Sequence, residues 1–189
     1  MRKLIFVLLA ITTTCSFGQT SLYKQPIEKN GFIFGLGLGA GVLSLNTNDT
    51  LNVSFSTTLP NIKVGYMVTK RLAILAFLPG ANYKYNGKDR GFEGLILAGQ
   101  YWIKDKWWVL GGTGLTFDAP AFYTVKDPTT AGFYTGIPAF SFATGYEVWQ
   151  KGRFALDLQY RIFVGQSMLP GNGRREGISN MFVVGFNWY

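Results

Sequence analysis

The chain has 189 residues, a length that corresponds to one domain, and its 18 basic and 10 acidic side chains give a net charge of +8. It has one cysteine and no histidine, which excludes a disulfide framework and removes the commonest metal ligand and the commonest general base. Aromatic residues at 16% and 24 glycines, with few charges, favour β structure over a helical membrane protein.

Residues 1–18 have the layout of a secretory signal peptide. Met1–Lys3 is basic, Leu4–Ile11 is apolar, and small polar residues lead to a cleavage position before Gln19. The apolar run is too short to span a bilayer. We therefore expect an exported chain that begins at Gln19, with a short leader over 19–30 and a barrel over 31–189.

Cleavage removes Cys15 and two basic residues, which leaves 16 basic side chains and no thiol. A lipoprotein signal at Cys15 is disfavoured, because Thr12 stands where such a site has an aliphatic residue. The remaining basic residues are scattered through predicted turns instead of lying on one face. Together with export, this argues against nucleic acid as a partner.

The first predicted strand, Gly31–Leu45, has large apolar residues on one face and glycines on the other. The apolar positions are Phe32, Phe34, Leu36, Leu38, Ala40 and Val42, and the glycines are Gly31, Gly35, Gly37, Gly39 and Gly41. A glycine strip would be a poor solvated surface, but in a narrow barrel it leaves space for bulky lumen residues. The pattern favours a membrane barrel, with a secreted lipocalin-like barrel as an alternative.

Seven further strands follow. They are Val53–Val68, Leu72–Tyr85, Phe92–Ile103, Trp107–Phe117, Tyr134–Trp149, Phe154–Gly165 and Ile178–Tyr189. The second contains Pro60, which cannot donate to a sheet ladder, and the apolar parity changes there, so we expect a bulge. The third is apolar on both faces, and its sequence does not assign them. The last must pair with the first to close the sheet.

The connections alternate in predicted length between long and short. The long ones are Asn46–Asn52, Asn86–Gly91, Asp118–Phe133 and Gln166–Gly177, and the short ones are Thr69–Arg71, Lys104–Lys106 and Gln150–Gly152. An even number of antiparallel strands with short turns at one end is typical of outer-membrane barrels. The predicted fold is therefore all-β: an eight-stranded, antiparallel, up-and-down transmembrane β-barrel.

A weak repeat precedes each short turn. Tyr66, Tyr101 and Tyr146 each stand two residues before an aliphatic residue, and basic residues follow. In a barrel these tyrosines face outward near the turns, where we expect them to join Trp107 and Trp188 in an interfacial aromatic girdle.

The signal peptide, the eight alternating strands and the final Gly185-Phe-Asn-Trp-Tyr189 resemble the small outer-membrane β-barrel proteins of Gram-negative bacteria, of OmpA/OmpX-type architecture. The resemblance covers residues 31–189. It implies integral insertion in the outer membrane, contact with its lipid, and assembly by the barrel-assembly machinery. Enzymes of this architecture imply a catalytic histidine, so we expect no enzyme. Tyr189 departs from the pattern, since it lies one position beyond the outward phase.

Five polar residues fall on the predicted lumen face: Lys63, Glu147, Asp157, Gln159 and Arg161. Charges inside a narrow barrel must pair, so we expect a plug of salt bridges and hydrogen bonds. An acid/base pair of carboxylates is disfavoured because an eight-stranded lumen has little room for substrate. The alternative is a narrow lumen that binds or transports one small hydrophobic molecule.

Basic residues in the predicted outer loops are candidates to contact lipopolysaccharide phosphates, with ordinary solvated charges as the alternative. They are Lys88, Arg90, Lys126, Arg174 and Arg175. No motif predicts a metal site, a cofactor or a catalytic residue. The sequence therefore predicts a barrel with a filled lumen and a structural or surface-interaction role through its extracellular loops.

Overall fold

The computed structural model describes residues 28–48, 50–121 and 132–189. The predicted signal peptide, most of the predicted leader and Lys126 lie outside these ranges. The strands are β1 (Phe32–Thr47), β2 (Thr50–Met67), β3 (Leu72–Phe77), β4 (Gly80–Tyr85), β5 (Lys88–Lys104), β6 (Trp107–Pro120), β7 (Tyr134–Lys151), β8 (Phe154–Met168) and β9 (Arg174–Trp188), with a short 3-10 turn, η1 (Pro170–Asn172).

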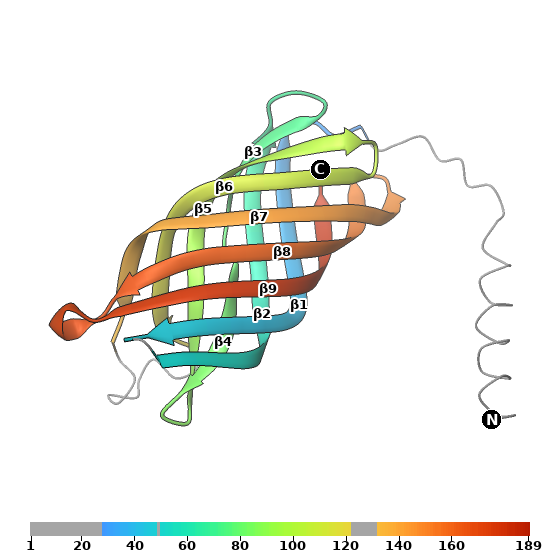
Figure 1. Ribbon diagram of the computed structural model, residues 1–189. Coiled ribbons are helices and arrows are strands. Elements are labelled where there is room, and N and C mark those ends of the chain that lie inside the picture. The colour runs from blue at the N-terminus through green and yellow to red at the C-terminus, as the bar shows by residue number, and fades with distance from the viewer. Residues whose placement is uncertain (1–27, 49, 122–131) are drawn as a thin grey trace, which may run out of the picture.

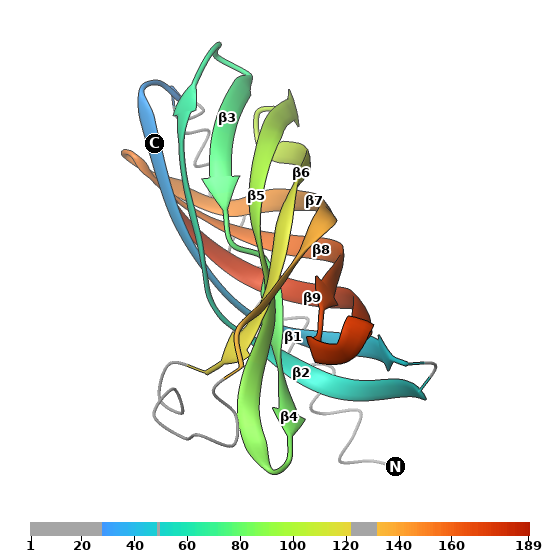
Figure 2. The same cartoon turned by 90° about the vertical axis from the view of Figure 1, so that its left-hand side faces the viewer.

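These strands form one antiparallel sheet that closes on itself. Their order is β3-β2-β1-β9-β8-β7-β6-β5-β4, and β3 also pairs with β5. β1 pairs with β9 along nearly its whole length, from Phe34 opposite Trp188 to Thr47 opposite Arg175. The predicted pairing of first and last strands is confirmed. Figure 1 shows the tilted strands of the resulting barrel, and Figure 2 shows them after a turn of 90°.

The third predicted strand, Leu72–Tyr85, is divided into β3 and β4 by Leu78 and Pro79. The two parts occupy one position in the ring, so the barrel has eight strand positions although nine segments form it. Pro79 has no N–H to donate, but its carbonyl accepts a 2.8 Å hydrogen bond from Gly94 of β5. Ala73, Leu75 and Phe77 are buried inside, which assigns the faces that the sequence did not.

The predicted bulge near Pro60 is confirmed. Gly37 of β1 pairs with Asn61, whereas Gly39 pairs with Thr58, so β2 contains an extra residue between them. Thr58 and Asn61 are both buried although three positions separate them. The inward phase of β2 therefore changes at the bulge, as a period of two requires.

Between the bulges, side chains alternate between lumen and outer wall. On β9 the exposed residues include Ile178, Phe182, Val184 and Phe186, while Met181 and Val183 between them are buried. The ten steps from Ile178 to Trp188 span about 34 Å along the strand, or about 26 Å along the barrel axis at the usual tilt of about 40°. This height matches the apolar band of about 25 Å found on outer-membrane barrels.

The two ends of the barrel differ. The short turns 68–71, 105–106 and 152–153 lie at one end with the C-terminus, since Tyr189 N donates to Arg153 O. We name this the turn end and the opposite one the loop end. Within the described residues no helix is long and apolar enough to cross a membrane.

Two connections at the loop end are tighter than predicted. β4 and β5 continue to a Tyr85–Lys88 pair around Asn86 and Gly87, whose φ angles are 50° and 76°. Positive φ at both central residues is the requirement of a type I′ hairpin turn, which Asn-Gly satisfies readily. The predicted loop 86–91 was therefore wrong beyond Gly87. β1 and β2 likewise pair as far as Thr47 and Thr50.

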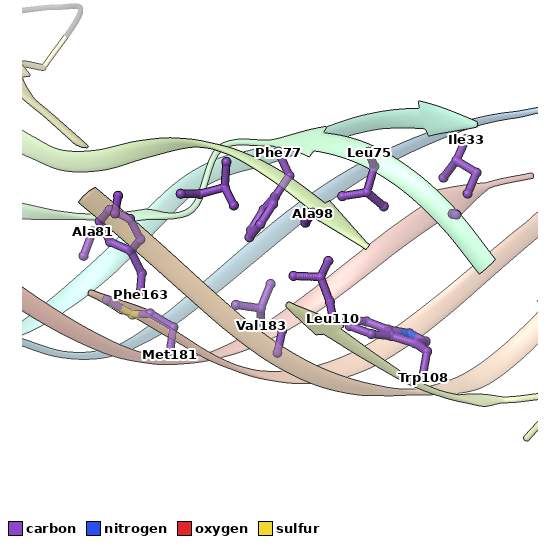
Figure 3. Packing of buried hydrophobic residues seen from close by; sticks show 14 of the residues in the cluster. Ile33, Leu75, Phe77, Ala81, Ala98, Trp108, Leu110, Phe163, Met181 and Val183 are labelled. Atoms are coloured by element: carbon purple, nitrogen blue, oxygen red, sulfur yellow. The ribbon is translucent and has the colours of Figure 1, made fainter. Parts of the chain in front are cut away.

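The lumen is packed with side chains. Figure 3 shows Phe77, Leu110, Val183 and Phe163 pointing inward from different strands. The rings of Phe92 and Phe163 lie 5.8 Å apart. A Cβ at Gly94 would lie 2.6 Å from the Phe163 ring, so glycine on the lumen face makes room for this aromatic layer.

Candidate functional site

The lumen contains three polar clusters, which we name by their central carboxylates. The Asp157 cluster lies between the other two along the barrel axis. Asp157 accepts hydrogen bonds from Trp108 Nε1 at 3.0 Å, from Gln159 Nε2 at 2.7 Å and from Asn187 Nδ2 at 3.0 Å. The carboxylate is fully buried, and these donors from β6, β8 and β9 offset the loss of its hydration.

Two cations flank this carboxylate without a direct ion pair among the described residues. Lys63 Nζ lies 3.1 Å from Gln100 Oε1 and 4.9 Å from the centre of the Trp108 ring. Arg161 donates to Gln159 Oε1 at 2.6 Å and also to Asn61 Oδ1. Of the predicted salt bridges and hydrogen bonds, this cluster contains the hydrogen bonds: amide side chains and an indole lie between the charged groups.

The Glu147 cluster closes the turn end. Glu147 accepts hydrogen bonds from Tyr189 Oη at 2.7 Å and Trp102 Nε1 at 2.9 Å, and forms a 3.2 Å ion pair with Lys29. Lys29 also donates to the Asp105 carbonyl at 2.9 Å and lies over the rings of Trp102 and Tyr189. Lys29, three residues before β1, is thus bound inside the barrel mouth.

The Asp118 cluster lies at the loop end, beyond the apolar band. Asp118 forms ion pairs with Arg90, at 2.8 Å, and with Arg175. The Tyr83 hydroxyl lies 2.8 and 2.9 Å from the two carboxylate oxygens. Burial, followed by the charge of Asp118, raises the pKa of Tyr83 above its ordinary value, so the hydroxyl remains a donor.

Arg90 and Arg175 add bonds to backbone and neighbours. Arg90 Nη2 donates to Asp118 O at 3.0 Å and to Gly132 O at 2.7 Å. Arg175 Nε donates to Thr47 Oγ1 at 3.1 Å. The cluster therefore ties β4, β5, β6 and β9 together and binds Gly132, two residues before β7.

All five predicted lumen residues are buried inside the barrel: Lys63, Glu147, Asp157, Gln159 and Arg161. Two of the predicted loop cations differ from expectation. Arg90 and Arg175 are buried against Asp118, because β5 and β9 extend beyond their predicted ends and keep these residues in the inward phase. Lys88 and Arg174 are exposed, and Arg174 pairs with Glu176 at 3.4 Å.

Several polar lumen partners were not predicted, among them Lys29, Asn61, Gln100 and Asp118. Asn61 and Gln100 share the inward parity of their strands, so the period of two could have found them. Lys29 stands in a segment without periodicity. Among the described residues, no group of histidine, cysteine or acidic side chains is arranged to hold a metal ion.

The described part of the barrel carries hollows on its surface. One, of about 440 Å³, lies on the outer wall near the loop end and touches Leu51, Phe140, Val164 and Ile178. A second, about 240 Å³, lies at the turn end between the turns that contain Lys70 and Lys104. A third, about 170 Å³, lies on the wall beside the β3–β4 break, next to Ile62 and Glu93.

No protein-family model and no curated protein matches the sequence. Solved structures do match. Neisserial surface protein A (NspA) is 17% identical; the alignment covers 82% of this chain and 96% of NspA, with a TM-score of 0.55. The fold is that of a small outer-membrane β-barrel protein.

Two further structures align with this outer-membrane barrel at lower TM-scores. Ail, the attachment invasion locus protein of Yersinia pestis, is 10% identical over 85% of this chain and 100% of its own, with a TM-score of 0.48. The outer membrane protein AlkL is 13% identical, and the alignment covers 90% of this chain and 95% of AlkL, with a TM-score of 0.47. Outer-membrane barrels in general have their short turns on the periplasmic side. On this general ground we call the turn end, with the Glu147 cluster, the periplasmic end, and the loop end, with the Asp118 cluster, the extracellular end.

Proposed function

We propose that this barrel is a non-conducting scaffold in the outer membrane that acts through its extracellular end, in a structural or surface-interaction role. The observation that carries the proposal is the continuous filling of the lumen. From the periplasmic side it passes through the Glu147 cluster, the Asp157 cluster, the Phe92–Phe163 layer and the Asp118 cluster.

Opening a water-filled path through the lumen would require separating charged side chains from the groups that they hydrogen-bond or pair with. The Arg161 guanidinium lies 5.1 Å from the Phe77 ring and also holds Gln159, so it joins the polar and apolar layers. At the two ends of the lumen, breaking the buried Lys29–Glu147 or Arg90–Asp118 pair would leave an uncompensated charge, which costs about 3–5 kcal/mol. An eight-stranded interior has room only for such side chains or for one small ligand. This supports a closed barrel over the alternative of a transport lumen.

The extracellular end supports the interaction role. The Asp118 cluster braces four strands there, so that the neighbouring surface is presented on a rigid base. Lys84, Lys88 and Arg174 are exposed at this end. The anions that these cations would contact are the phosphates of lipopolysaccharide, for which arginine and lysine are suitable donors. The proposal includes no catalytic step.

Conductance tests the scaffold half of the proposal. The protein is inserted into planar lipid bilayers and the current is recorded under voltage. We expect no stepwise current from the folded protein, because the lumen layers are bonded across the barrel. Regular single-channel steps at low voltage would contradict the closed lumen and favour the transport alternative.

Lipopolysaccharide binding tests the interaction half. Lys88→Gln together with Arg174→Gln removes two exposed cations at the extracellular end. The matched control is Lys151→Gln with Arg153→Gln, which removes the same charge at the periplasmic end. We expect only the first pair to weaken binding of lipopolysaccharide to the protein in micelles. Equal binding by both pairs would contradict a phosphate site at the extracellular end.

A further inference from the structure

Six exposed basic side chains surround the periplasmic end of the barrel. They come in pairs from the three short turns: Lys70 and Arg71, Lys104 and Lys106, Lys151 and Arg153. The exposed acidic residues near them are Glu28 and Asp105. None of the six forms an ion pair within the described part of the chain. We name these six residues the basic ring.

The basic ring lies directly beyond an aromatic girdle. Tyr66, Tyr101 and Tyr146, the repeat seen in the sequence, are all exposed on the outer wall, at 52%, 46% and 52%. The Arg153 guanidinium lies 4.6 Å from the centre of the Trp188 ring. Aromatic girdles lie at the level of lipid headgroups. The basic side chains therefore reach the depth at which headgroup phosphates lie.

Two of the turns enclose a hollow of about 240 Å³. Lys70 and Arg71 line it from the β2–β3 turn and Lys104 from the β5–β6 turn, with Trp102 at its inner side. Lys29, which is already paired with Glu147, and the exposed carboxylates of Glu28 and Asp105 also line it, so exposed cations outnumber exposed carboxylates by three to two. The exposed cations thus converge on a space large enough for a phosphate group, and arginine can bind phosphate through two parallel hydrogen bonds.

We propose that the basic ring binds the phosphates of anionic phospholipids in the periplasmic leaflet, with this hollow as its principal site. The inference goes beyond the proposed function, which concerns the other end of the barrel. Charge complementarity carries it: unpaired cations at headgroup depth attract anionic lipid by about 1 kcal/mol, or about fivefold in affinity, for each basic side chain.

The adjoining outer wall favours a lipid over a free anion. β3 lies between the two turns, and its Ile74 is exposed and pairs with Gly99 of β5. Nothing lies within 4 Å of a Cβ built at Gly99. Tyr66 and Tyr101 flank this open strip. An acyl chain can therefore lie along Ile74 and Gly99 while its headgroup reaches the hollow.

Native mass spectrometry tests the proposal. The protein in detergent micelles is offered equal amounts of phosphatidylglycerol and phosphatidylcholine, and the retained lipids are counted. We expect phosphatidylglycerol to be preferred. The triple variant Lys70→Gln, Arg71→Gln and Lys104→Gln should lose about fivefold in phosphatidylglycerol affinity for each basic side chain removed.

The matched control is Lys84→Gln, Lys88→Gln and Arg174→Gln, which removes the same charge at the extracellular end and should keep the preference. All six side chains are exposed, so both triple variants should fold, as heat-modifiable migration on gels will verify. Equal retention of both lipids by the unchanged protein, or equal loss in both variants, would overturn the proposal. Displacement of phosphatidylglycerol by inorganic phosphate at equal concentration would overturn the lipid assignment. The conductance test does not involve this site. In the lipopolysaccharide test only the control variant, Lys151→Gln with Arg153→Gln, removes ring residues, and neither residue lines the hollow, so the two proposals fail separately.

Discussion

The hydroxyl of Tyr189 donates a 2.7 Å hydrogen bond to Glu147, which lies 42 positions earlier in the chain. Both side chains are fully buried, and the Tyr189 ring packs edge-on against Trp102 at 5.6 Å. This contact explains why Tyr189 departs from the outward phase of β9: its side chain closes the lumen and does not face lipid.

Tyr189→Phe tests this role. The change keeps the ring and removes one hydrogen bond to a buried carboxylate, so we expect the free energy of unfolding to fall by about 1.5–3 kcal/mol. Tyr160→Phe is the control, because the Tyr160 hydroxyl bonds Asn180 at 3.0 Å on the exposed wall. Urea unfolding in lipid vesicles measures both. A loss for Tyr189→Phe no larger than that of the control would argue against a closing role.

Asp118→Asn should destabilise the extracellular end. It removes the carboxylate that pairs with two buried guanidinium groups, Arg90 and Arg175, and breaking a buried pair costs about 3–5 kcal/mol. Glu176→Gln is the matched control, since its pair with Arg174 is about half exposed and should contribute less than about 1 kcal/mol. The same urea titration compares them. Similar losses from both variants would contradict a brace at Asp118.

Leu158→Arg places a charge on the lipid-facing wall, where Leu158 is 54% exposed. We expect a loss of about 2–4 kcal/mol and impaired assembly, because basic residues are costly within the apolar band. Val68→Arg, at the periplasmic edge, should cost no more than about 1 kcal/mol, since the penalty falls with depth. Heat-modifiable migration and vesicle refolding yields check the difference. If Leu158→Arg folds as well as Val68→Arg, this wall does not face lipid.

Gly35→Ala tests the glycine strip. A Cβ there would lie 2.6 Å from Lys63 Cε and 2.9 Å from Asn187 Oδ1, inside the bonded lumen. We expect lower stability by about 1–3 kcal/mol, the usual penalty of overpacking. Gly99→Ala is the control, because a Cβ at Gly99 meets open space on the outer wall. A variant at position 35 that is as stable as the one at position 99 would show that the lumen is looser than described.

How far the sequence predicts this barrel depends on periodicity. Alternation correctly assigned the two faces of β1, β8 and β9, and the parity change at Pro60 correctly located the bulge. It could not assign the third strand, whose residues are apolar on both sides. The ion pair between Lys29 and Glu147 could not be predicted from periodicity either, because the two residues lie far apart in the chain and meet only when the barrel closes.

The Asp118 cluster was not predicted, for a different reason. Turn-forming residues predict strand ends that come too early, so Arg90, Asp118 and Arg175 fall in predicted loops. Asp118 shares its parity with Trp108 and Thr116, both buried on the same strand. Continuing the period of two beyond the predicted strand ends would have placed all three residues inside.

The division of the third strand also determines where the wall is weakest. β3 pairs with β2 only over Ala73–Phe77, and β4 pairs with β5 and not with β2. The part of β2 nearer the loop end is therefore hydrogen-bonded to β1 alone. The residues of β2 that precede Asn61 are therefore paired with a neighbouring strand on one side only. We expect their amides to exchange with deuterated water before those of β8, which is paired on both sides. This segment would be the first to open when the barrel unfolds and the last to join when it assembles.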